Sequence, residues 1–500
     1  MNRKHFRRIF SAVLTLIMVF TLMAPFANAA VGIYYTDVTG SSKQTTAINY
    51  LHEHGVMGRP FTAALTRKAS IQTNKFAPNQ AVTRLQLVHA MWNMYGSPNV
   101  VESTIRMQDV YTNPDYLTAM RWAVGLGILD SVASGSYAPD EALSIEEVML
   151  MLYRFVGYCG YDVSYSRTML PRRLGNEEID HAINWGLSKG FITARTARGD
   201  YTSDCSRGSV ATYLYQIYEI YQKKYGLTVV NTYDLPAASR SGKGMANMFR
   251  AAGAETISRE DIYYTTYTKE TGPSFVASMK EAFSKAKALD ICYLYCYSHG
   301  REGDGLILFK GSKDVSILSP SELRAEIDKY QGTFVVFANG CYTGTYIQKG
   351  ANNTDNTEDL FDAESFVSAL MSTGQNKRSK YNLVDESGRI KVFCSSSQSE
   401  FSWSTDGSWP KSYAADAWLI GCGMVGYSQT YYFSGKELPS DVNGDRKVSM
   451  SELFDFAYDR VVVKEFYYEK DGQYYRQHMV CYPENDDTII FEIRDWEFFN

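Results

Sequence analysis

The sequence predicts a two-part chain in which an all-helical region of repeats precedes an α/β domain with a mostly parallel sheet and helices on both faces. The first observation is a helical pattern that recurs three times between residues 31 and 225. The second is the alternation of apolar strands with amphipathic helices from residue 226 to residue 461. A strand-rich extension is expected over residues 462–500. A chain of 500 residues has room for both regions.

The composition is that of an ordinary globular protein. Hydrophobic residues make up 45% of the chain, charged residues make up 21%, and the net charge is −5. No strongly basic region is present, which argues against a nucleic-acid partner. The eight cysteines are too few for a disulfide scaffold in a chain of this length, and their scatter does not match metal-ligand spacing.

The first 29 residues have the pattern of a secretory signal peptide. Basic residues at positions 3 to 8 precede an apolar run over residues 9–26, and Ala27-Asn28-Ala29 supplies the small residues that cleavage requires. We therefore expect a secreted, extracellular protein. An uncleaved membrane anchor is the alternative, because the run is near the minimum length that spans a bilayer. No later segment is apolar enough to be transmembrane.

The helical region is expected to contain three copies of one unit, over about residues 31–98, 99–162 and 163–225. In each copy a helix-like segment runs into a Gly-apolar step, at Gly55, Gly127 and Gly190. An aromatic residue and a turn follow, and then a second amphipathic helix, such as residues 84–95 or 145–156. Repetition at this interval indicates one structural unit used three times.

The repeats resemble S-layer homology modules, which are all-helical and bind the secondary polysaccharide of Gram-positive-type cell walls. In that family a Thr-Arg-Ala-Glu segment starts the second helix, and its Arg helps to hold the polysaccharide. The copies here read Thr83-Arg84-Leu85-Gln86, Ser144-Ile145-Glu146-Glu147 and Ser206-Arg207-Gly208-Ser209. The resemblance implies a cell-wall location and Arg84 and Arg207 as polysaccharide ligands. An exposed, solvated charge is the alternative for each arginine.

Strands and helices alternate in the second region, which predicts a mostly parallel sheet. The expected strands cover residues 227–231, 291–297, 333–338 and 390–394. The expected helices lie near residues 243–251 and over 275–288, 319–329, 414–422 and 451–458. Residues 305–309 are expected to form a hairpin.

Two of these strands end in small polar clusters. Tyr297-Ser298-His299-Gly300 follows one, and Asn339-Gly340-Cys341-Tyr342-Thr343-Gly344 follows the other. Open α/β sheets place their sites beyond the carboxyl ends of the strands. Cys341 is therefore a candidate nucleophile and His299 a candidate acid/base. The backbone N–H groups of Gly300 and Cys341 are candidate oxyanion donors.

These motifs resemble those of the caspase-like cysteine peptidases, which include caspases, metacaspases, legumains, gingipains and clostripain. Members share a strand that ends in His-Gly and a second strand that ends in a Cys followed closely by Gly. The resemblance covers about residues 226–461 and implies cleavage of a protein or peptide substrate by a Cys341/His299 dyad through an acyl-enzyme, without an organic cofactor. The alternative is a catalytically degenerate homologue that acts as a binding or structural protein at the cell surface.

The same resemblance implies substrate contacts. The serine-rich segment that contains Ser396 and Glu400 resembles a later strand of the family that helps to line the substrate cleft. Many relatives carry an acid two positions before the Cys, where this chain has Asn339, so a preference for Arg or Lys is not implied. Either Glu400, Asp304 or Asp362 replaces the missing charge, or these three are surface acids.

Residues 441–452 have the ligand spacing of an EF-hand-like calcium loop. The oxygen-bearing groups are Asp441, Asn443, Asp445, the backbone carbonyl of Lys447, Ser449 and Glu452. Arg446 stands where the EF-hand turn favours Gly, and the nearby Gly444 relieves part of that strain. We expect Ca²⁺ at this loop, and a plain Asp/Asn/Gly turn is the alternative.

Overall fold

The structure is a computed structural model. It describes residues 34–39, 42–61, 74–98, 105–109, 113–167, 169–170, 174–193, 201–233, 235–265, 272–310, 315–347, 389–405, 410–427, 430–435, 437–465, 468–470, 473–475, 477–486 and 488–492. The expected signal peptide and Asp362 lie outside these residues. Within them, no helix has both the length and the apolar character needed to cross a membrane.

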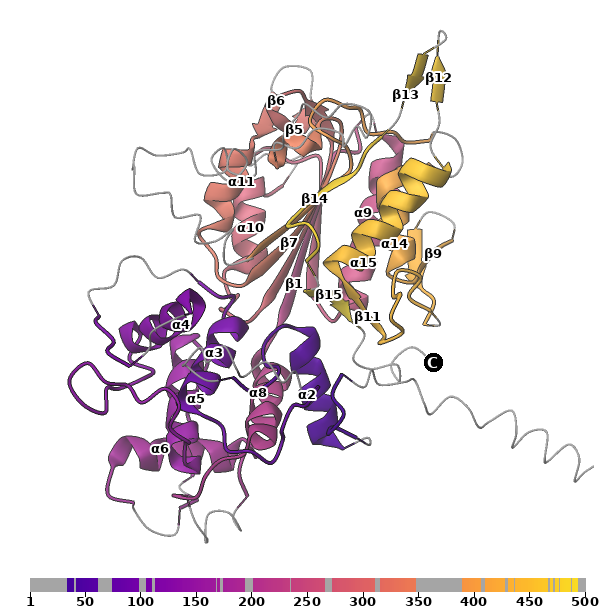
Figure 1. Cartoon of the computed structure of the whole chain (residues 1–500). Coiled ribbons are helices and arrows are strands. Elements are labelled where there is room, and N and C mark those ends of the chain that lie inside the picture. Colours follow the sequence, from indigo (N-terminus) through magenta and orange to yellow (C-terminus); the bar gives the residue numbers. More distant parts are fainter. Residues whose placement is uncertain are drawn as a thin grey trace, which may run out of the picture.

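Helices pack in pairs in the amino-terminal domain, which lies in the lower part of Figure 1. They are α2 (Lys43–Glu53), α3 (Arg84–Met94), α4 (Pro114–Gly125), α5 (Ile145–Tyr158), α6 (Glu177–Ser188) and α8 (Arg207–Tyr221). Helix α3 packs on α4, α5 on α6, and α2 on α8. The second helix of each copy thus packs on the first helix of the next copy, and the last copy returns to the first.

Three short backbone segments join the three copies at the centre of the helical domain, where the copies form a closed ring. The Val82 N–H donates to the Cys205 carbonyl at 2.9 Å, the Leu143 N–H donates to the Val82 carbonyl at 3.0 Å, and the Cys205 N–H donates to the Leu143 carbonyl at 2.8 Å. Each segment leads into a second helix whose N-cap side chain is Thr83, Ser144 or Ser206. The cyclic hydrogen bonds give the domain an approximately threefold arrangement.

A six-stranded sheet forms the centre of the carboxyl-terminal domain. Its strands, in spatial order, are β14 (Val480–Tyr482), β8 (Ile390–Cys394), β7 (Thr333–Asn339), β3 (Ile291–Tyr297), β1 (Lys224–Val230) and β2 (Glu255–Glu260). Strand β14 runs antiparallel to β8, and all other neighbours are parallel. The domain is therefore α/β with a mostly parallel sheet.

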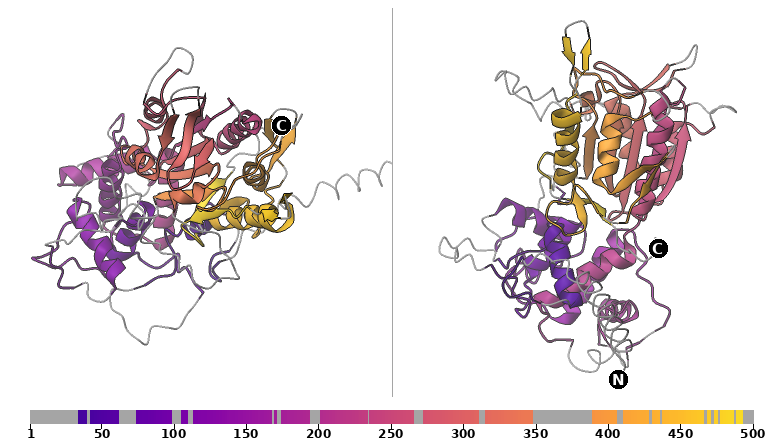
Figure 2. Two further views of the ribbon diagram at one scale, coloured as in Figure 1. Left: turned by 90° about the horizontal axis from the view of Figure 1, so that it is seen from above. Right: turned by 90° about the vertical axis from the view of Figure 1, so that its right-hand side faces the viewer.

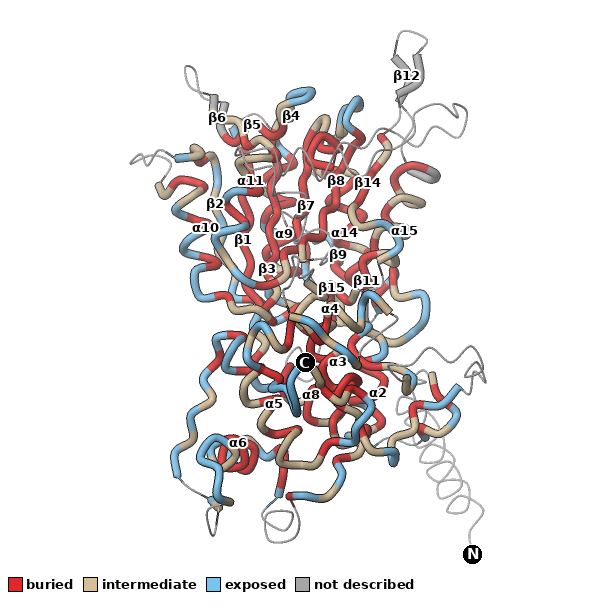
Figure 3. The backbone as a smooth tube through the Cα atoms, turned by 60° about the vertical axis from the view of Figure 1, so that its left-hand side comes forward, coloured by how far each residue is buried: buried red, intermediate tan, exposed pale blue. Residues whose placement is uncertain are grey.

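Helices cover both faces of this sheet (Figure 1). One face carries α10 (Phe275–Phe283) and α11 (Pro320–Ile327), and the other carries α9 (Pro236–Ala251), α14 (Tyr413–Gly421) and α15 (Met450–Tyr458). Strand β3 is apolar on both sides, because Cys292, Leu294 and Cys296 face the α10 side while Tyr293, Tyr295 and Tyr297 face the α9 side. Figure 3 shows the resulting buried backbone along the central strands.

Shorter elements surround the central sheet. They are β4 (His299–Arg301), β5 (Gly305–Lys310), β6 (Val315–Leu318), η1 (Thr343–Tyr346), β9 (Met424–Tyr427), β10 (Thr430–Phe433), β11 (Lys447–Ser449), η2 (Asp459–Glu465), β12 (Tyr468–Lys470), β13 (Gln473–Tyr475) and β15 (Ile489–Glu492). The hairpin expected at residues 305–309 is larger than predicted, because β4, β5 and β6 form a three-stranded antiparallel sheet that begins at His299.

Two expected boundaries need correction. Strand β1 begins at Lys224, inside the region assigned to the third repeat. Among the described residues of the expected strand-rich extension, β14 completes the central sheet and β15 pairs with β11, so these two strands belong to the carboxyl-terminal domain. Both corrections depend on strand pairing between residues far apart in sequence, which local sequence patterns do not report.

The two domains are in direct contact, and Figure 2 shows this contact from two further sides. Tyr161 of the helical domain donates its hydroxyl to the buried carboxylate of Asp290 at 2.8 Å. Leu289, beside it, packs in the hydrophobic core of the helical domain. At a second point the ammonium of Lys447 forms an ion pair with Glu53 of α2. The interface thus combines apolar packing with buried polar links.

Candidate active site

The carboxyl ends of β3 and β7 bring the two predicted catalytic residues to one edge of the sheet. The strands are adjacent and parallel, and Tyr297 lies opposite Asn339 in their register. His299 and Cys341 each follow two residues after this pair. The Ser298 N–H still donates to the Asn339 carbonyl at 3.1 Å, so the pairing continues to the point where the chains leave the sheet.

The two chain segments touch beyond the strands, and glycine makes this possible. A Cβ atom added to Gly300 would lie 1.7 Å from the Cys341 carbonyl oxygen. One added to Gly340 would lie 2.4 Å from the Ser298 carbonyl oxygen. Both neighbours are backbone atoms that a rotamer change cannot move away. Neither position therefore has room for a side chain. This explains why glycine follows His299 and why glycine precedes Cys341.

Cys341 is the chemically distinct thiol of the chain. All eight cysteines are free, and Cys341 is the one that is not buried. Its Sγ contacts the Ser402 carbonyl oxygen at 3.8 Å. Burial raises the pKa of the Cys341 thiol, while backbone hydrogen bonds from Ser402 and Gly300 act in the opposite direction. Burial has the larger effect, so the pKa of the thiol is raised overall and the site disfavours the thiolate.

A left-handed turn follows Cys341 and is held by the serine-rich segment. Tyr342 has φ +58°, and its N–H donates to the Glu400 carbonyl at 2.8 Å. The Gly340 N–H donates to Ser395 Oγ at 2.9 Å, and Ser396 Oγ donates to the Gly340 carbonyl at 2.9 Å. Ser396, a predicted substrate contact, is fully buried in the structure and binds the nucleophile segment.

Asn339 lies inside the protein. Its side chain is fully buried, and its amide nitrogen donates to the Tyr295 hydroxyl at 2.9 Å and to Ser412 Oγ at 3.0 Å. Its amide oxygen accepts from Ser402 Oγ at 3.4 Å. An amide can satisfy these neutral hydroxyl partners without the cost of burying a charge. The position two before Cys341 thus serves as a buried polar link in this chain.

Comparisons with known proteins were made on the whole chain. No family model matches the sequence, and no curated protein matches it. Among solved structures, one that matches is caspase-1 from Spodoptera frugiperda, with a TM-score of 0.30 and 11% sequence identity. That match covers 52% of this chain and 85% of the caspase chain.

Glu400, the other predicted substrate contact, is paired within the chain. Its carboxylate accepts from the His478 backbone N–H at 3.0 Å and lies 2.7 Å from His478 Nδ1. The alternative acid Asp304 forms an ion pair with Arg301 on the same hairpin. His478 was not predicted as a site residue, because nothing in the sequence around it connects it to Cys341.

Aromatic side chains stand next to the nucleophile. The ring of Tyr342 meets that of Phe401 edge-on at 5.2 Å between centroids, and Trp403 lies 6.0 Å beyond Phe401. Phe401 is 46% exposed, so part of this aromatic group is open to solvent beside Cys341. An exposed apolar ring therefore lies close to the nucleophile, and the charge of Glu302 also acts on Tyr342.

The predicted calcium loop has a turn geometry with its carboxylates directed at its own backbone. Gly444 and Arg446 both have positive φ, at +76° and +66°. Asp441 accepts the N–H groups of Gly444 at 2.7 Å and Arg446 at 2.8 Å. Glu452 accepts the Ser449 N–H at 2.9 Å, in the capping box of α15.

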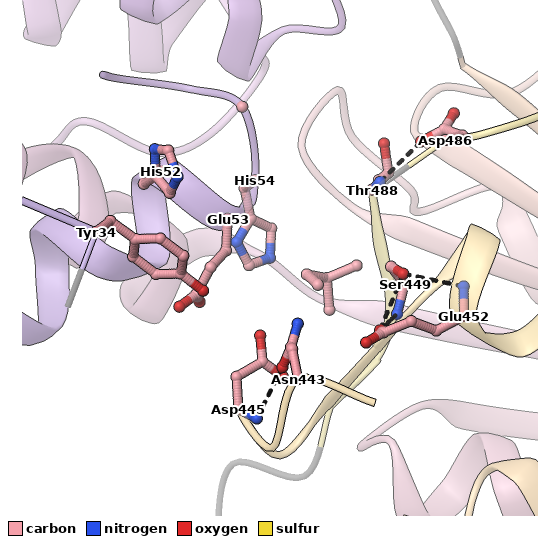
Figure 4. Close-up of a pocket in the computed structure, with 12 residues that line it drawn as sticks. Tyr34, His52, Glu53, His54, Asn443, Asp445, Ser449, Glu452, Asp486 and Thr488 are labelled. Carbon is pink, nitrogen blue, oxygen red and sulfur yellow. Dashed lines mark hydrogen bonds between the residues drawn. The ribbon is translucent and has the colours of Figure 1, made fainter. Parts of the chain in front are cut away.

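Figure 4 shows the space between this loop and α2. It is a cavity of about 570 Å³ into which Glu53 and Tyr34 face from one domain and Asn443, Asp445 and Glu452 from the other. Burial, followed by the charge of Glu53, raises the pKa of Asp445 to about 6. Within the described residues, no group of three or more His, Cys, Asp or Glu side chains converges as metal ligands. The predicted ligands also include the Asn443 and Ser449 side chains and the Lys447 carbonyl, and calcium binding stays a prediction.

Arg84 and Arg207 are buried, so the alternative of exposed, solvated charges is wrong for both. Arg84 donates to the Ala138 carbonyl at 2.8 Å and to Glu141 at 2.8 Å. Arg207 is 1% exposed and donates to the Phe76 carbonyl at 2.9 Å. Each arginine therefore reaches from its own repeat to the aromatic turn of another repeat. Their predicted contact with polysaccharide stays a prediction.

Proposed function

We propose that the chain is a cysteine endopeptidase of the caspase-like class, with Cys341 and His299 as its catalytic dyad. The observation that carries this proposal is the register of β3 and β7, which delivers both residues to one sheet edge with Gly300 against the Cys341 backbone. Neither residue alone would support it, because strand-end Cys and His residues are common in cores.

The proposed reaction is acyl transfer to sulfur. His299 takes the proton of the Cys341 thiol, and the thiolate attacks the carbonyl carbon of the scissile peptide bond. The backbone N–H groups of Gly300 and Cys341 stabilise the oxyanion. The protonated His299 then gives its proton to the departing amine, which leaves a thioester on Cys341. Water, activated by His299, hydrolyses the thioester and restores the thiol.

The substrate we propose is a protein or peptide with a neutral side chain near the scissile bond. Asn339 is buried and bonded, and Glu400 is paired with His478, so neither offers a free charge to a basic side chain. The aromatic group of Tyr342, Phe401 and Trp403 instead favours an apolar side chain.

The helical domain is proposed to place this peptidase at the surface of a Gram-positive-type cell. The motif order of the three copies supports S-layer homology modules, and the amino-terminal sequence supports export. Arg84 and Arg207, the predicted polysaccharide ligands, are buried and form hydrogen bonds within the helical domain. Binding of the full chain to purified cell walls, with release by free wall polysaccharide, tests this part.

One observation favours the alternative of a non-catalytic surface protein. Burial raises the pKa of the Cys341 thiol, which disfavours the thiolate that the proposed reaction needs. Digestion of a peptide library by the purified chain and by the Cys341→Ala variant separates the two functions. The proposed peptidase requires cleavage by the wild type alone, and absence of cleavage in both proteins supports the binding role.

A further inference from the structure

A segment far from the dyad in sequence contacts the loop that covers Cys341. Residues 477–478 come just before β14, which pairs with β8 at the edge of the sheet. Gln477 is fully buried, accepts the Trp403 N–H at 2.9 Å, and donates to the Ser395 carbonyl at 2.6 Å. It also donates to the Ser402 hydroxyl at 3.2 Å. The Ser402 carbonyl is the group that contacts the Cys341 thiol.

His478 holds the same loop at a second point. Its backbone N–H and its ring nitrogen Nδ1 both engage the carboxylate of Glu400, at 3.0 Å and 2.7 Å. A carboxylate only accepts, so Nδ1 carries the proton in this pair. The Glu400 backbone carbonyl in turn accepts the Tyr342 N–H at 2.8 Å. One chain of contacts therefore runs from His478 through Glu400 to the residue that follows Cys341.

The turn at Tyr342 needs such a restraint. A non-glycine residue with φ +58° is in the left-handed region, where a bulky side chain crowds its own backbone and the conformation is strained. The hydrogen bond from the Tyr342 N–H to the Glu400 carbonyl holds the turn in this conformation. Without the restraint, the backbone after Cys341 can relax toward ordinary φ values and carry the thiol away from Gly300.

We propose that His478 is a positioning residue that fixes the Cys341 nucleophile through Glu400 and the turn at Tyr342. This inference rests on the proposed peptidase function and extends it to a residue of the carboxyl-terminal strand segment. It also assigns Glu400 a role in holding the nucleophile in place of the predicted contact with substrate.

The ionisation of Glu400 in the pair with His478 predicts how activity depends on pH. Burial raises the pKa of Glu400, but hydrogen bonds from His478 outweigh it and leave the pKa below its usual range. The groups that act on the Glu400 carboxylate, besides burial, are His478 and Ser397. In the wild type the pair is intact at neutral pH and is lost as the pH falls through the lowered pKa. Removing the His478 side chain takes away the largest contribution that lowers the pKa of Glu400, so the acid limb of activity moves to higher pH.

The test compares His478→Ala with His478→Asn, whose amide retains a donor to Glu400. We expect His478→Ala to lower kcat by about 10- to 100-fold with little change in KM, and His478→Asn to restore most of it. His181→Ala is the matched control, because His181 also pairs with an acid and a tyrosine but lies on α6 of the helical domain.

A second readout does not need turnover. Cys341 is the one thiol that is not buried, so iodoacetamide on the folded chain reports on it, with the modified residue identified by mass spectrometry. Release of the loop exposes the thiol, and we expect His478→Ala to raise the alkylation rate by about threefold or more while kcat falls. If the wild type cleaves no peptide, the peptidase proposal fails, and the alkylation rates still test the positioning role.

Unchanged kcat and unchanged alkylation in His478→Ala would overturn the proposal. The same holds if His478→Asn behaves like His478→Ala in both readouts, because the hydrogen bond to Glu400 would then not be the cause. If His478→Ala does not fold, Glu400→Ala replaces it, since alanine offers no acceptor to either donor of His478 but keeps the backbone carbonyl that binds the Tyr342 N–H.

Discussion

At the scale of single residues, two glycines allow the strand ends that carry the proposed dyad to lie close together. The sequence predicts Gly300 as an oxyanion donor because a residue without a Cβ lets a substrate carbonyl approach its N–H closely. The structure adds a second reason, since a Cβ at this position would overlap the Cys341 carbonyl. The side chain that is absent at residue 300 thus lets the two strand ends approach.

Gly300→Ala is therefore expected to remove activity and to lower the free energy of unfolding by about 1–3 kcal/mol, because the backbone of Cys341 must shift. Gly157→Ala in α5 is the control, since a Cβ there meets nothing nearer than 3.8 Å and alanine favours the helix. Turnover and denaturant unfolding measure both variants. A fully active Gly300→Ala protein would contradict the close approach.

Arg207 is predicted to stabilise the ring of repeats. Its guanidinium donates to the carbonyls of Phe76 and Gly58 and to Gln86 Oε1, and burial lowers its pKa to about 10. Arg207→Ala leaves these acceptors unpaired, and we expect a loss of about 2–4 kcal/mol in unfolding free energy. Lys43→Ala, at an exposed ion pair with Glu219, should cost less than about 0.5 kcal/mol. Equal losses in urea melts of the two variants would count against a structural role for Arg207.

At the scale of elements, the sequence predicts what local patterns control. Strands β3 and β8 have the expected bounds, since both are apolar runs between polar breaks. Helix α11 begins after Ser319 in a capping box, as its Ser-Pro-Ser-Glu start predicts. Contacts between distant segments were not predictable, because His478, Gln477 and strand β14 meet the site only through the fold.

The loop 441–452 has a structural role that is independent of any cation. Glu452 is in the capping box of α15, and Gln also serves in such a box. With EDTA present, we expect the wild type and Glu452→Gln to unfold at the same temperature. The unfolding temperatures of both proteins are then measured in millimolar Ca²⁺, which tests whether the loop binds the cation. A rise in unfolding temperature confined to the wild type would establish the predicted cation site, whereas no rise in either protein makes the loop a structural turn.

At the scale of the whole molecule, the structure joins the two domains more closely than a flexible anchor would. Tyr161 donates to Asp290, and the Asp290 carboxylate also accepts the N–H groups of Lys223 and Lys287 at 2.8 Å each. Asp290 directly precedes β3, the strand that leads to His299. The helical domain thus contacts the base of the strand that carries the proposed acid/base.

Tyr161→Phe removes one buried hydrogen bond to a carboxylate. We expect a loss of about 1–3 kcal/mol and, in calorimetry, separation of one unfolding transition into two as the domains uncouple. Tyr165→Phe is the control, because its hydroxyl bonds His181 at the exposed surface. Two separate transitions in the wild type would show that the contact does not couple the domains.

The central claim is that Cys341 and His299 act as a pair, and a double-mutant cycle on kcat/KM tests it most directly. The substrate is the best peptide from the library digest, and the proteins are the wild type, Cys341→Ala, His299→Ala and the double variant. Because the two groups serve one reaction, each single change should lower kcat/KM by at least about 10³-fold, and the double change should cost no more than either alone. Additive losses, or cleavage that persists in Cys341→Ala, would contradict the dyad.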